Sequence, residues 1–366
     1  MAYSVPNLIK EYYIAYFDIL GYKEFFRQHP DKVPELLNSI HNAIQRTKEH
    51  ISILRQSPLL GEFAQIDIRE RLFSDNILLC METSDDRLEP VRSLAFIKAV
   101  SDIQRGFVLD YGLFVRGGIV KGQLSFNDDY VFGQGVIDAV SMEGTAQYPR
   151  ILISKDIVNE LNNTRFCSHK AYEHALKIVE KMKNGENVSE EDAKQCAVAN
   201  NNCFLDQLFQ YLNKDIMVSW DDNCWVVNYL YIIDLSSIIA PDVIEQFSKA
   251  VLTASPKDAE MFMPKANIQD QQKQTQELFL QAHKRIVQNK LKEFGNYVDI
   301  ALENIKKAET REKILKKYIW VMAYHNRVCR SVQKMDYFIS TICNCDTRFL
   351  KTTIEVVEDE PKALAD

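Results

Sequence analysis

The stretch Tyr12–Phe26 reads YYIAYFDILGYKEFF, and the fold prediction starts from it. Its first seven residues are rich in aromatic and β-branched side chains, which is typical of a buried strand. Asp18 ends this strand, and Gly21 follows at a position suited to a turn. The stretch therefore predicts a buried strand that leads directly into a helix.

Strand and helix patterns alternate over the next 140 or so residues, as the spacing of apolar positions shows. We expect a helix over Val33–Leu54, strands over Ile66–Phe73 and Asn76–Met81 with a Ser74–Asp75 turn, a helix over Pro90–Val108, strands over Leu113–Lys121 and Asp128–Phe132, a helix over Gly133–Ala146, and a strand over Arg150–Ser154. Glycines inside Leu113–Lys121 predict a close backbone approach or a bulge. This order predicts an α+β fold with a ferredoxin-like βαββαβ core, followed by a mainly helical C-terminal region.

The chain is expected to divide into four parts. These are an α+β core at 1–163, a helical insertion with extra strands that complete the core at 164–240, a helical C-terminal region at 241–355, and an acidic tail at 356–366. Apolar stripes from Leu280 to Ile305 and from Ile314 to Ile339 predict two antiparallel helices joined near Ala308–Glu312. His325 lies on the second stripe, where a core histidine is favoured over a catalytic base.

Composition restricts the classes of partner. The 366 residues are 46% hydrophobic and 26% charged, as in a globular protein. The net charge of -7 argues against a broad nucleic-acid-binding surface. No apolar stretch reaches the ~20 residues of a membrane span, and the first residues do not resemble a secretory signal. The eight cysteines show no paired metal-ligand spacing, so we expect reduced thiols in a cytoplasmic protein.

Two aspartates stand at matching ends of neighbouring predicted strands. Asp18 ends the first strand, and Asp75 lies in the hairpin of RLFSDNILLC. In a βαββαβ core these two ends come close together, and two carboxylates there suit a pair of Mg²⁺ ions. Ile19 would add a backbone carbonyl, and the amides of Gly21 and Tyr22 would face phosphate at the start of the helix. The alternative is a turn and a helix cap without any ligand.

Five segments in this order resemble the catalytic domain of class III nucleotidyl cyclases, the adenylate and guanylate cyclases. They read YFDILGYKEFF, FSDNILL, VRGGIVKG, YVFGQGVIDAVSMEG and YPRILIS, and they cover roughly residues 10 to 160. The resemblance implies a homodimer that binds a nucleoside triphosphate between two such domains. It also implies that two Mg²⁺ or Mn²⁺ ions, on Asp18 and Asp75 with Ile19 as a backbone ligand, align the ribose 3′-oxygen against the α-phosphate, after which pyrophosphate leaves.

The same resemblance bears on the base. Arg71 falls where adenylate cyclases have a base-reading lysine, and Tyr130 where they have a base-reading aspartate. This is not the adenine pair, so the resemblance implies a different base and leaves cytosine, uracil and guanine open. Bacterial relatives of the family make cyclic pyrimidine nucleotides in antiphage signalling. The C-terminal segment LKKYIWVMAYHNRVC is similar to that of bacterial proteins that join this core to a helical tail.

The chain also departs from the family pattern. Ile137 and Ser141 occupy the positions of a ribose-orienting asparagine and an arginine that stabilises the transition state. Losing that arginine removes a charge-assisted contact to phosphate. Arg116 and Arg150 are candidate substitutes, although a structural ion pair is the alternative for Arg116. Ser74 stands where the family usually has glycine.

Three functions remain after this comparison. The first is a metal-dependent cyclase that converts a nucleoside triphosphate to a cyclic monophosphate. The second is a catalytically degenerate sensor that binds nucleotide and acts through its helical region, which the departures at Ile137 and Ser141 motivate. The third is a scaffold whose helices bind a protein partner and whose aspartates only form turns.

Overall fold

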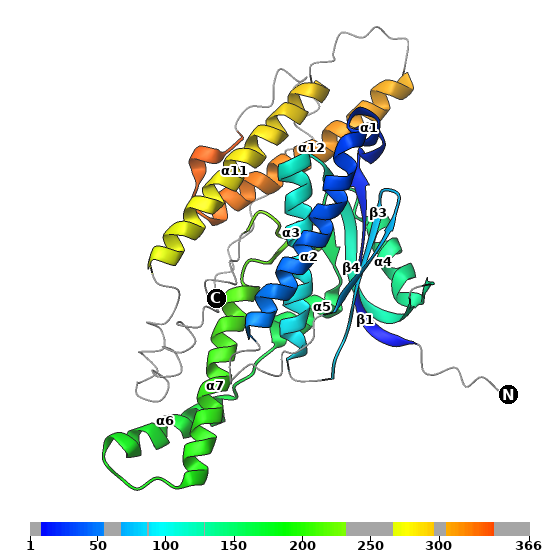
Figure 1. Ribbon diagram of the computed structural model, residues 1–366. Coiled ribbons are helices and arrows are strands. Elements are labelled where there is room, and N and C mark those ends of the chain that lie inside the picture. Colours follow the sequence, from blue (N-terminus) through cyan, green and yellow to red (C-terminus); the bar gives the residue numbers. More distant parts are fainter. Residues whose placement is uncertain are drawn as a thin grey trace, which may run out of the picture.

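A mixed sheet with helices on both faces forms the centre of the molecule (Figure 1). The structure is a computed structural model that describes residues 9–54, 67–85, 88–127, 129–231, 266–295 and 305–339. Its strands are β1 (Lys10–Leu20), β2 (Ile68–Phe73), β3 (Asn76–Glu82), β4 (Phe114–Phe126), β5 (Val131–Phe132), β6 (Ile151–Ile153), β7 (Met217–Ser219) and β8 (Trp225–Val227). Its helices are α1 (Tyr22–Gln28), α2 (Val33–Leu54), α3 (Glu89–Tyr111), α4 (Gln134–Thr145), α5 (Lys155–Asn163), α6 (His169–Lys183), α7 (Glu190–Asn213), α11 (Ala266–Gly295) and α12 (Ile305–Ser331), with short 3-10 turns η1 (Pro30–Lys32) and η3 (Met335–Tyr337).

The order of the strands confirms the predicted α+β fold. The sheet runs β2-β3-β1-β4-β6-β8-β7, and β5 pairs with β4 outside this path. Among the first four strands in chain order each neighbouring pair is antiparallel, and β1 lies between β3 and β4. This is the pairing of a βαββαβ core. Beyond it, β6 joins β4 in parallel, and β8 and β7 extend the sheet. Ile66, Asp128, residues 232–265 and the predicted acidic tail lie outside the described residues.

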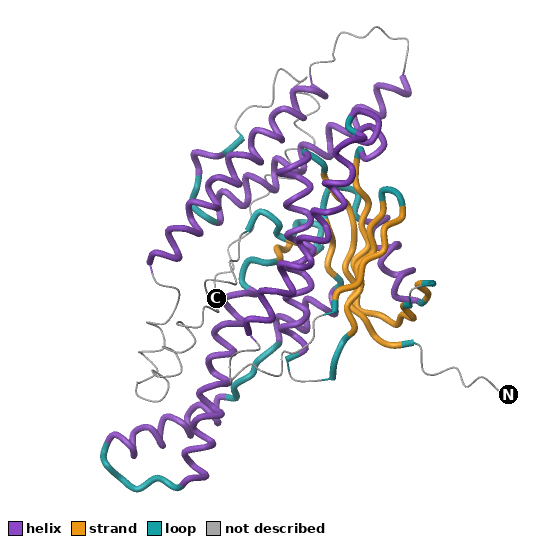
Figure 2. The backbone as a smooth tube through the Cα atoms, viewed as in Figure 1, coloured by secondary structure: helices purple, strands orange, loops and turns teal. Residues whose placement is uncertain are grey.

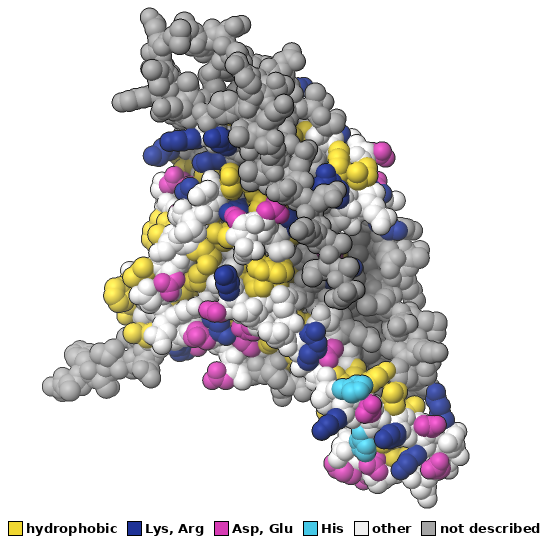
Figure 3. Space-filling view, turned by 180° about the vertical axis from the view of Figure 1, so that it is seen from behind, with side chains coloured by type: hydrophobic (Ala, Val, Ile, Leu, Met, Phe, Trp, Pro, Cys, Tyr) yellow, Lys and Arg dark blue, Asp and Glu magenta, His cyan; other side chains and the backbone are white. Residues whose placement is uncertain are grey.

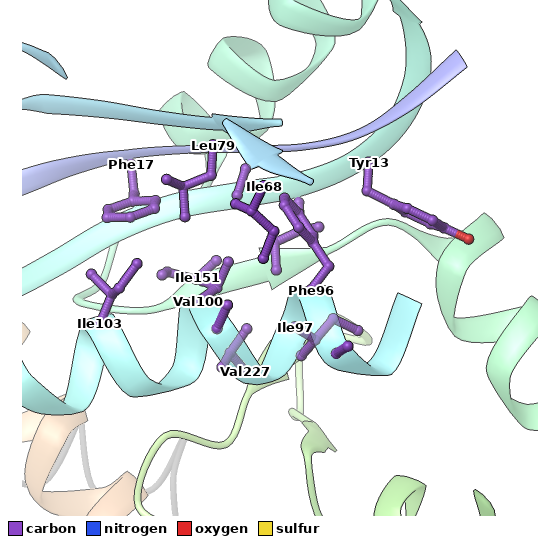
Figure 4. Packing of buried hydrophobic residues seen from close by; sticks show 14 of the residues in the cluster. Tyr13, Phe17, Ile68, Leu79, Phe96, Ile97, Val100, Ile103, Ile151 and Val227 are labelled. Carbon is purple, nitrogen blue, oxygen red and sulfur yellow. The ribbon is translucent and has the colours of Figure 1, made fainter. Parts of the chain in front are cut away.

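The side chains of β1 alternate between two apolar layers, as the period of a strand requires. Tyr13, Phe17 and Ile19 face a large core shared with α2 and α3. Figure 4 shows the rings of Tyr13 and Phe17 with Leu79 above the aliphatic side chains of α3. Tyr12 and Ile14 face the opposite layer, which α4 covers. Because both faces of β1 are buried, its register fixes which of its side chains lie on the side of α4.

Two glycines inside β4 confirm the predicted close approach. A Cβ on Gly117 would lie 2.3 Å from the Cβ of Phe17 on β1, and one on Gly118 would lie 2.5 Å from the Cγ of Met142 on α4. Both separations are far below van der Waals contact, so a side chain at either position would push β1 or α4 away. The absence of side chains here lets β1 and α4 lie close against β4.

Helices α6 and α7 form a pair that extends away from the sheet (Figure 2). They share a small apolar cluster that includes Ala175 and Ile178. The Oγ of Ser189 accepts a hydrogen bond of 3.0 Å from the amide of Asp192 and so caps α7. The C-terminal half of α7 joins the main core through Phe209.

Helices α11 and α12 are antiparallel, as predicted. Glu277 pairs with Lys334 near one end of the hairpin, and His283 contacts His325 further along. The predicted junction was wrong, because residues 308–312 lie inside α12. Met335 was also misplaced on the apolar stripe, since it begins η3 with 56% of its surface exposed. Among the described helices, none is both long and apolar enough to cross a membrane.

A buried chain of hydrogen bonds ties this hairpin to the core. His325 Nε2 lies 2.9 Å from the carbonyl of Tyr337, which can only accept, so His325 donates there and presents an unprotonated Nδ1. His283 Nδ1 lies 3.0 Å from that atom and must donate to it. The remaining nitrogen, His283 Nε2, then accepts from the hydroxyl of Tyr229 at 2.8 Å. Burial lowers the pKa of both histidines, so this arrangement of donors and acceptors is the one that two neutral imidazoles adopt. The full burial of His325 confirms it as a core histidine.

The histidine pair should make the free energy of unfolding depend on pH. Burial lowers the pKa of His325 to about 4, and burial together with His325 lowers the pKa of His283 well below its usual value. Histidines of the unfolded chain bind protons near pH 6.5, so between about pH 6.5 and 4 the unfolded state binds more protons. Stability is therefore lost as the pH falls through this window. From His325 alone we expect a loss of about 2 kcal/mol between pH 7 and pH 5.

Urea denaturation at pH 7 and at pH 5 measures this loss. The variant His325→Asn should lose less stability on acidification than the wild type, while the exposed-site control His169→Gln should lose as much as the wild type. An equal loss in wild type and His325→Asn would show that the pair does not set the pH dependence.

Candidate functional site

The two predicted metal-binding aspartates meet at one end of the sheet. Asp18 lies opposite Asn76 in the β1–β3 ladder, and the next amide, that of Ile19, donates a 2.8 Å hydrogen bond to the carbonyl of Asp75. Asp75 occupies the two-residue turn between β2 and β3. Ser74, the other turn residue, has a φ of 61°, a left-handed conformation that glycine adopts at no steric cost. The chain therefore forms the tight turn with Ser74 at the position where glycine is usual.

Arg116 lies directly across the β1–β4 ladder from Asp18. Its guanidinium is 3.9 Å from the Asp18 carboxylate and forms a closer ion pair with Glu143 near the end of α4. The three side chains are only partly exposed. The Nε of Arg116 is buried and has no hydrogen-bond partner among the described residues. Arg116 therefore makes structural contacts and still keeps an unused donor beside the aspartates.

The local charges disfavour an ionised Asp18. Burial raises the pKa of this carboxyl, and the negative charges of Asp75 and Glu143 raise it further, while Arg116 and Lys317 act in the opposite direction. The net shift of the pKa is upward. A cation bound between Asp18 and Asp75 would relieve this repulsion.

The aspartate pair fits a divalent ion that takes its other ligands from a substrate. Within the described residues, no group of three or more His, Cys, Asp or Glu side chains is placed to hold a metal. Mg²⁺ is commonly bound by one or two carboxylates together with water and substrate phosphates. Asp18 and Asp75 match that pattern, whereas a metal enclosed by protein ligands alone would need more groups.

The predicted phosphate-facing residues follow Asp18 closely. Gly21 adopts a φ of 83° and caps α1, whose first residue is Tyr22. Only glycine takes this conformation freely, so Gly21 allows the chain to turn out of β1 into α1 within one residue. The amides of this turn therefore lie three to four residues beyond Asp18, at the same end of the sheet.

Arg71 and Tyr130, the predicted base readers, are brought to one place by Asn127. Arg71 donates to the carbonyl of Asn127 at 2.7 Å and lies over the ring of Phe126, with 4.6 Å between its guanidinium carbon and the ring centre. The Asn127 side chain accepts a 2.8 Å hydrogen bond from the amide of Tyr130. Arg71, on β2, thus contacts the turn between β4 and β5, and the exposed Tyr130 lies on that turn, on the α4 side of the sheet.

The remaining sequence candidates lie around α4. Ile137 and Ser141 point outward. The Ser141 hydroxyl donates a 2.7 Å hydrogen bond to the Ile137 carbonyl, one turn earlier in α4. Arg150 is buried and held by Asp222 at 2.5 Å and by the Ala146 carbonyl at 3.2 Å. Arg150 is therefore engaged in an ion pair, and Arg116 is the arginine that the fold brings to Asp18.

Sequence reasoning missed two members of this site. Glu143 was part of a quoted segment, YVFGQGVIDAVSMEG, but no spacing rule linked it to Arg116. Lys317 lies on α12, almost 300 residues from Asp18, yet its charge acts on the Asp18 carboxyl. No local signal in the sequence connects a lysine of the helical region with the end of β1.

No protein-family model matches the chain, and no curated protein matches its sequence. Among the solved structures that match is the adenylyl cyclase CyaB from P. aeruginosa, with 15% identity and a TM-score of 0.29 over 43% of this chain and 84% of that chain. A similarity this low carries no argument about function, so any argument about function must come from the residues of the site.

Replacing the carboxyl of Asp18 should stabilise the metal-free protein. Since its pKa is raised by folding, the ionised form costs stability at pH values above that pKa, and this cost disappears in Asp18→Asn. We expect the free energy of unfolding at pH 7 to rise by about 0.5–2 kcal/mol, the size seen when a strained functional group is removed. Calorimetry with a chelator present measures it.

The matched control is Asp129→Asn, because Asp129 is exposed on the β4–β5 turn. Its effect should stay within about 0.5 kcal/mol. A loss of stability in Asp18→Asn would instead mean that the Asp18–Arg116 ion pair is structural and that the site is not held under electrostatic strain.

Proposed function

We propose that this chain is a metal-dependent nucleotidyl cyclase that converts a nucleoside triphosphate to a cyclic monophosphate and pyrophosphate. The observation that carries the proposal is the meeting of Asp18 and Asp75 at one end of a βαββαβ sheet, with Arg116 directly across from Asp18. The ordered resemblance of five segments to class III cyclases supports the same function. In this proposal the protein acts in the bacterial cytoplasm, with antiphage signalling as its setting.

Asp18 and Asp75 would hold Mg²⁺ or Mn²⁺, with the backbone of Ile19 nearby. Bound metal would neutralise the triphosphate and favour the ionised 3′-hydroxyl of the ribose. The chain's own residues would then orient the reactants. Arg116, whose guanidinium lies 3.9 Å from the Asp18 carboxylate, would hold it from across the strand pair and offer its free Nε. The Gly21–Tyr22 turn follows Asp18 at the same end of the sheet, and its backbone amides would face the phosphates.

Arg71 and Tyr130 would read the base. The hydrogen bond from Arg71 to Asn127 and its stacking on Phe126 hold the guanidinium in a fixed position, and the exposed Tyr130 ring lies on the same turn. A guanidinium donates but cannot accept, so this position favours a base that presents acceptors. All four bases present acceptors, so adenine is disfavoured by the resemblance alone, and the proposal leaves cytosine, uracil and guanine open.

A homodimer belongs to the proposal. Large apolar side chains on β5 and α4 face outward, including Phe132 at 73% and Ile137 at 58% exposure, with Val140 and Tyr130 nearby. Figure 3 shows apolar side chains gathered on the left, over the part of the molecule that holds α4 and β5. Exposed apolar surface of this kind often marks an interface, and a second copy would cover it.

The second candidate is a nucleotide-binding sensor without turnover. It is favoured by the outward, uncharged side chains of Ile137 and Ser141, at the positions where the family has its ribose-orienting and transition-state residues. Such a protein would keep the aspartates for binding and pass the signal to its helical region.

Incubation with each of the four ribonucleoside triphosphates, with Mn²⁺ or Mg²⁺, tests the function. Mass spectrometry should detect one cyclic monophosphate with an equal amount of pyrophosphate. Because both metal ligands are required, Asp18→Ala and Asp75→Ala should each lower the rate by a factor of about 100 or more. The control Asp156→Asn, at an exposed position of α5, should keep the wild-type rate.

The other outcomes separate the three functions. Metal-dependent binding of one triphosphate without any product would replace the cyclase by the sensor. Neither product nor binding would leave a scaffold. A cyclic product that persists in both aspartate variants would contradict the site but not the activity.

A further inference from the structure

Helix α12 crosses the end of the sheet that carries the aspartates. The ring of Tyr318 meets the ring of Phe114 edge to face, with centres 5.6 Å apart, and Phe114 pairs with Leu20 at the end of β1. Leu20 packs against the same apolar cluster as α12. The helix is thus anchored two residues along β1 from Asp18.

Lys317 immediately precedes Tyr318 and is half-buried. The contact of Tyr318 with Phe114 holds Lys317 at this end of the sheet, and its charge acts on those of Arg116, Asp18 and Glu143. Burial lowers the pKa of its ammonium, and Arg116 adds to this effect, while the two carboxylates oppose it. Among the described residues, however, Lys317 forms no hydrogen bond and no ion pair within 4.0 Å.

A partly desolvated ammonium without a partner is costly unless something else binds it. The buried Nε of Arg116 likewise has no hydrogen-bond partner within the described part of the chain. Two cationic groups beside a pair of carboxylates therefore have donors that the described residues leave unused. An anion that approaches Asp18 and Asp75 together with a divalent ion would satisfy both of them.

We propose that Lys317 of α12, together with the free Nε of Arg116, binds phosphate oxygens of the nucleotide at the Asp18–Asp75 site and supplies the positive charge that the chain lacks at Ser141. This inference rests on the proposed function, because that function identifies the bound anion as a triphosphate. It makes the helical region part of the binding site, with a lysine contributed by the same chain.

Binding of inorganic tripolyphosphate in the presence of Mn²⁺ tests this role without any base. Calorimetry should show tight binding to the wild-type full chain. Loss of one charge-assisted hydrogen bond should weaken binding by about 10- to 100-fold in Lys317→Gln. Lys317→Arg keeps the charge and should stay within about threefold of the wild type. It also tests the role if the glutamine variant does not fold.

The matched control is Lys313→Gln, one turn earlier on the same helix and exposed. It should change the dissociation constant by less than about twofold, because surface charges are screened. The proposal is overturned if the wild type does not bind tripolyphosphate, if Lys317→Gln binds as tightly as the wild type, or if Lys313→Gln weakens binding as much as Lys317→Gln does.

The same variants separate this inference from the proposed function. If no triphosphate yields a cyclic product but tripolyphosphate binding depends on Lys317, the cyclase proposal fails and the phosphate site stands. If the wild type makes product and Lys317→Gln makes it with unchanged kcat and KM, the cyclase stands and the role of Lys317 is wrong.

Discussion

The position of β1 between β3 and β4 is the constraint on which the rest of the structure depends. Its register with β3 places Asp18 next to the Asp75 turn, and its register with β4 places Arg116 across from Asp18. Because both faces of β1 are buried, a slip of one residue would turn Phe17 towards α4 and Asp18 into the core below it. Gly117 allows the backbones to lie this close. The apolar core thus sets the geometry of the charged site.

Much of this arrangement could be predicted from local sequence. The Val33–Leu54 helix, the Ser74–Asp75 turn and the proximity of Asp18 to Asp75 follow from periodicity and from the βαββαβ order, and the structure has them all. These features depend on short stretches of chain whose residue types restrict the backbone. The close approach at Gly117 and Gly118 could also be predicted, because glycine within a strand usually marks a bulge or a neighbour that leaves no room for a side chain.

What could not be predicted depends on contacts between distant elements. The position of Lys317 follows from how α12 meets Phe114, and the neutral state of His325 follows from its burial between three segments. The α11–α12 junction was misplaced because residues 308–312 carry charges that suit a loop as well as an exposed helix face. Periodicity identifies the buried face of a helix, but it does not identify the surface that this face meets.

If Asp18 and Asp75 form one metal-dependent phosphate site, both carboxylates must bind the same metal ion. Crystals grown with Mn²⁺ and the non-cleavable α,β-methylene analogue of the preferred triphosphate test it directly through the anomalous scattering of manganese. We expect an anomalous peak within about 2.5 Å of carboxylate oxygens of both Asp18 and Asp75. A peak coordinated by other residues, or an analogue bound with neither aspartate near the metal, would contradict it.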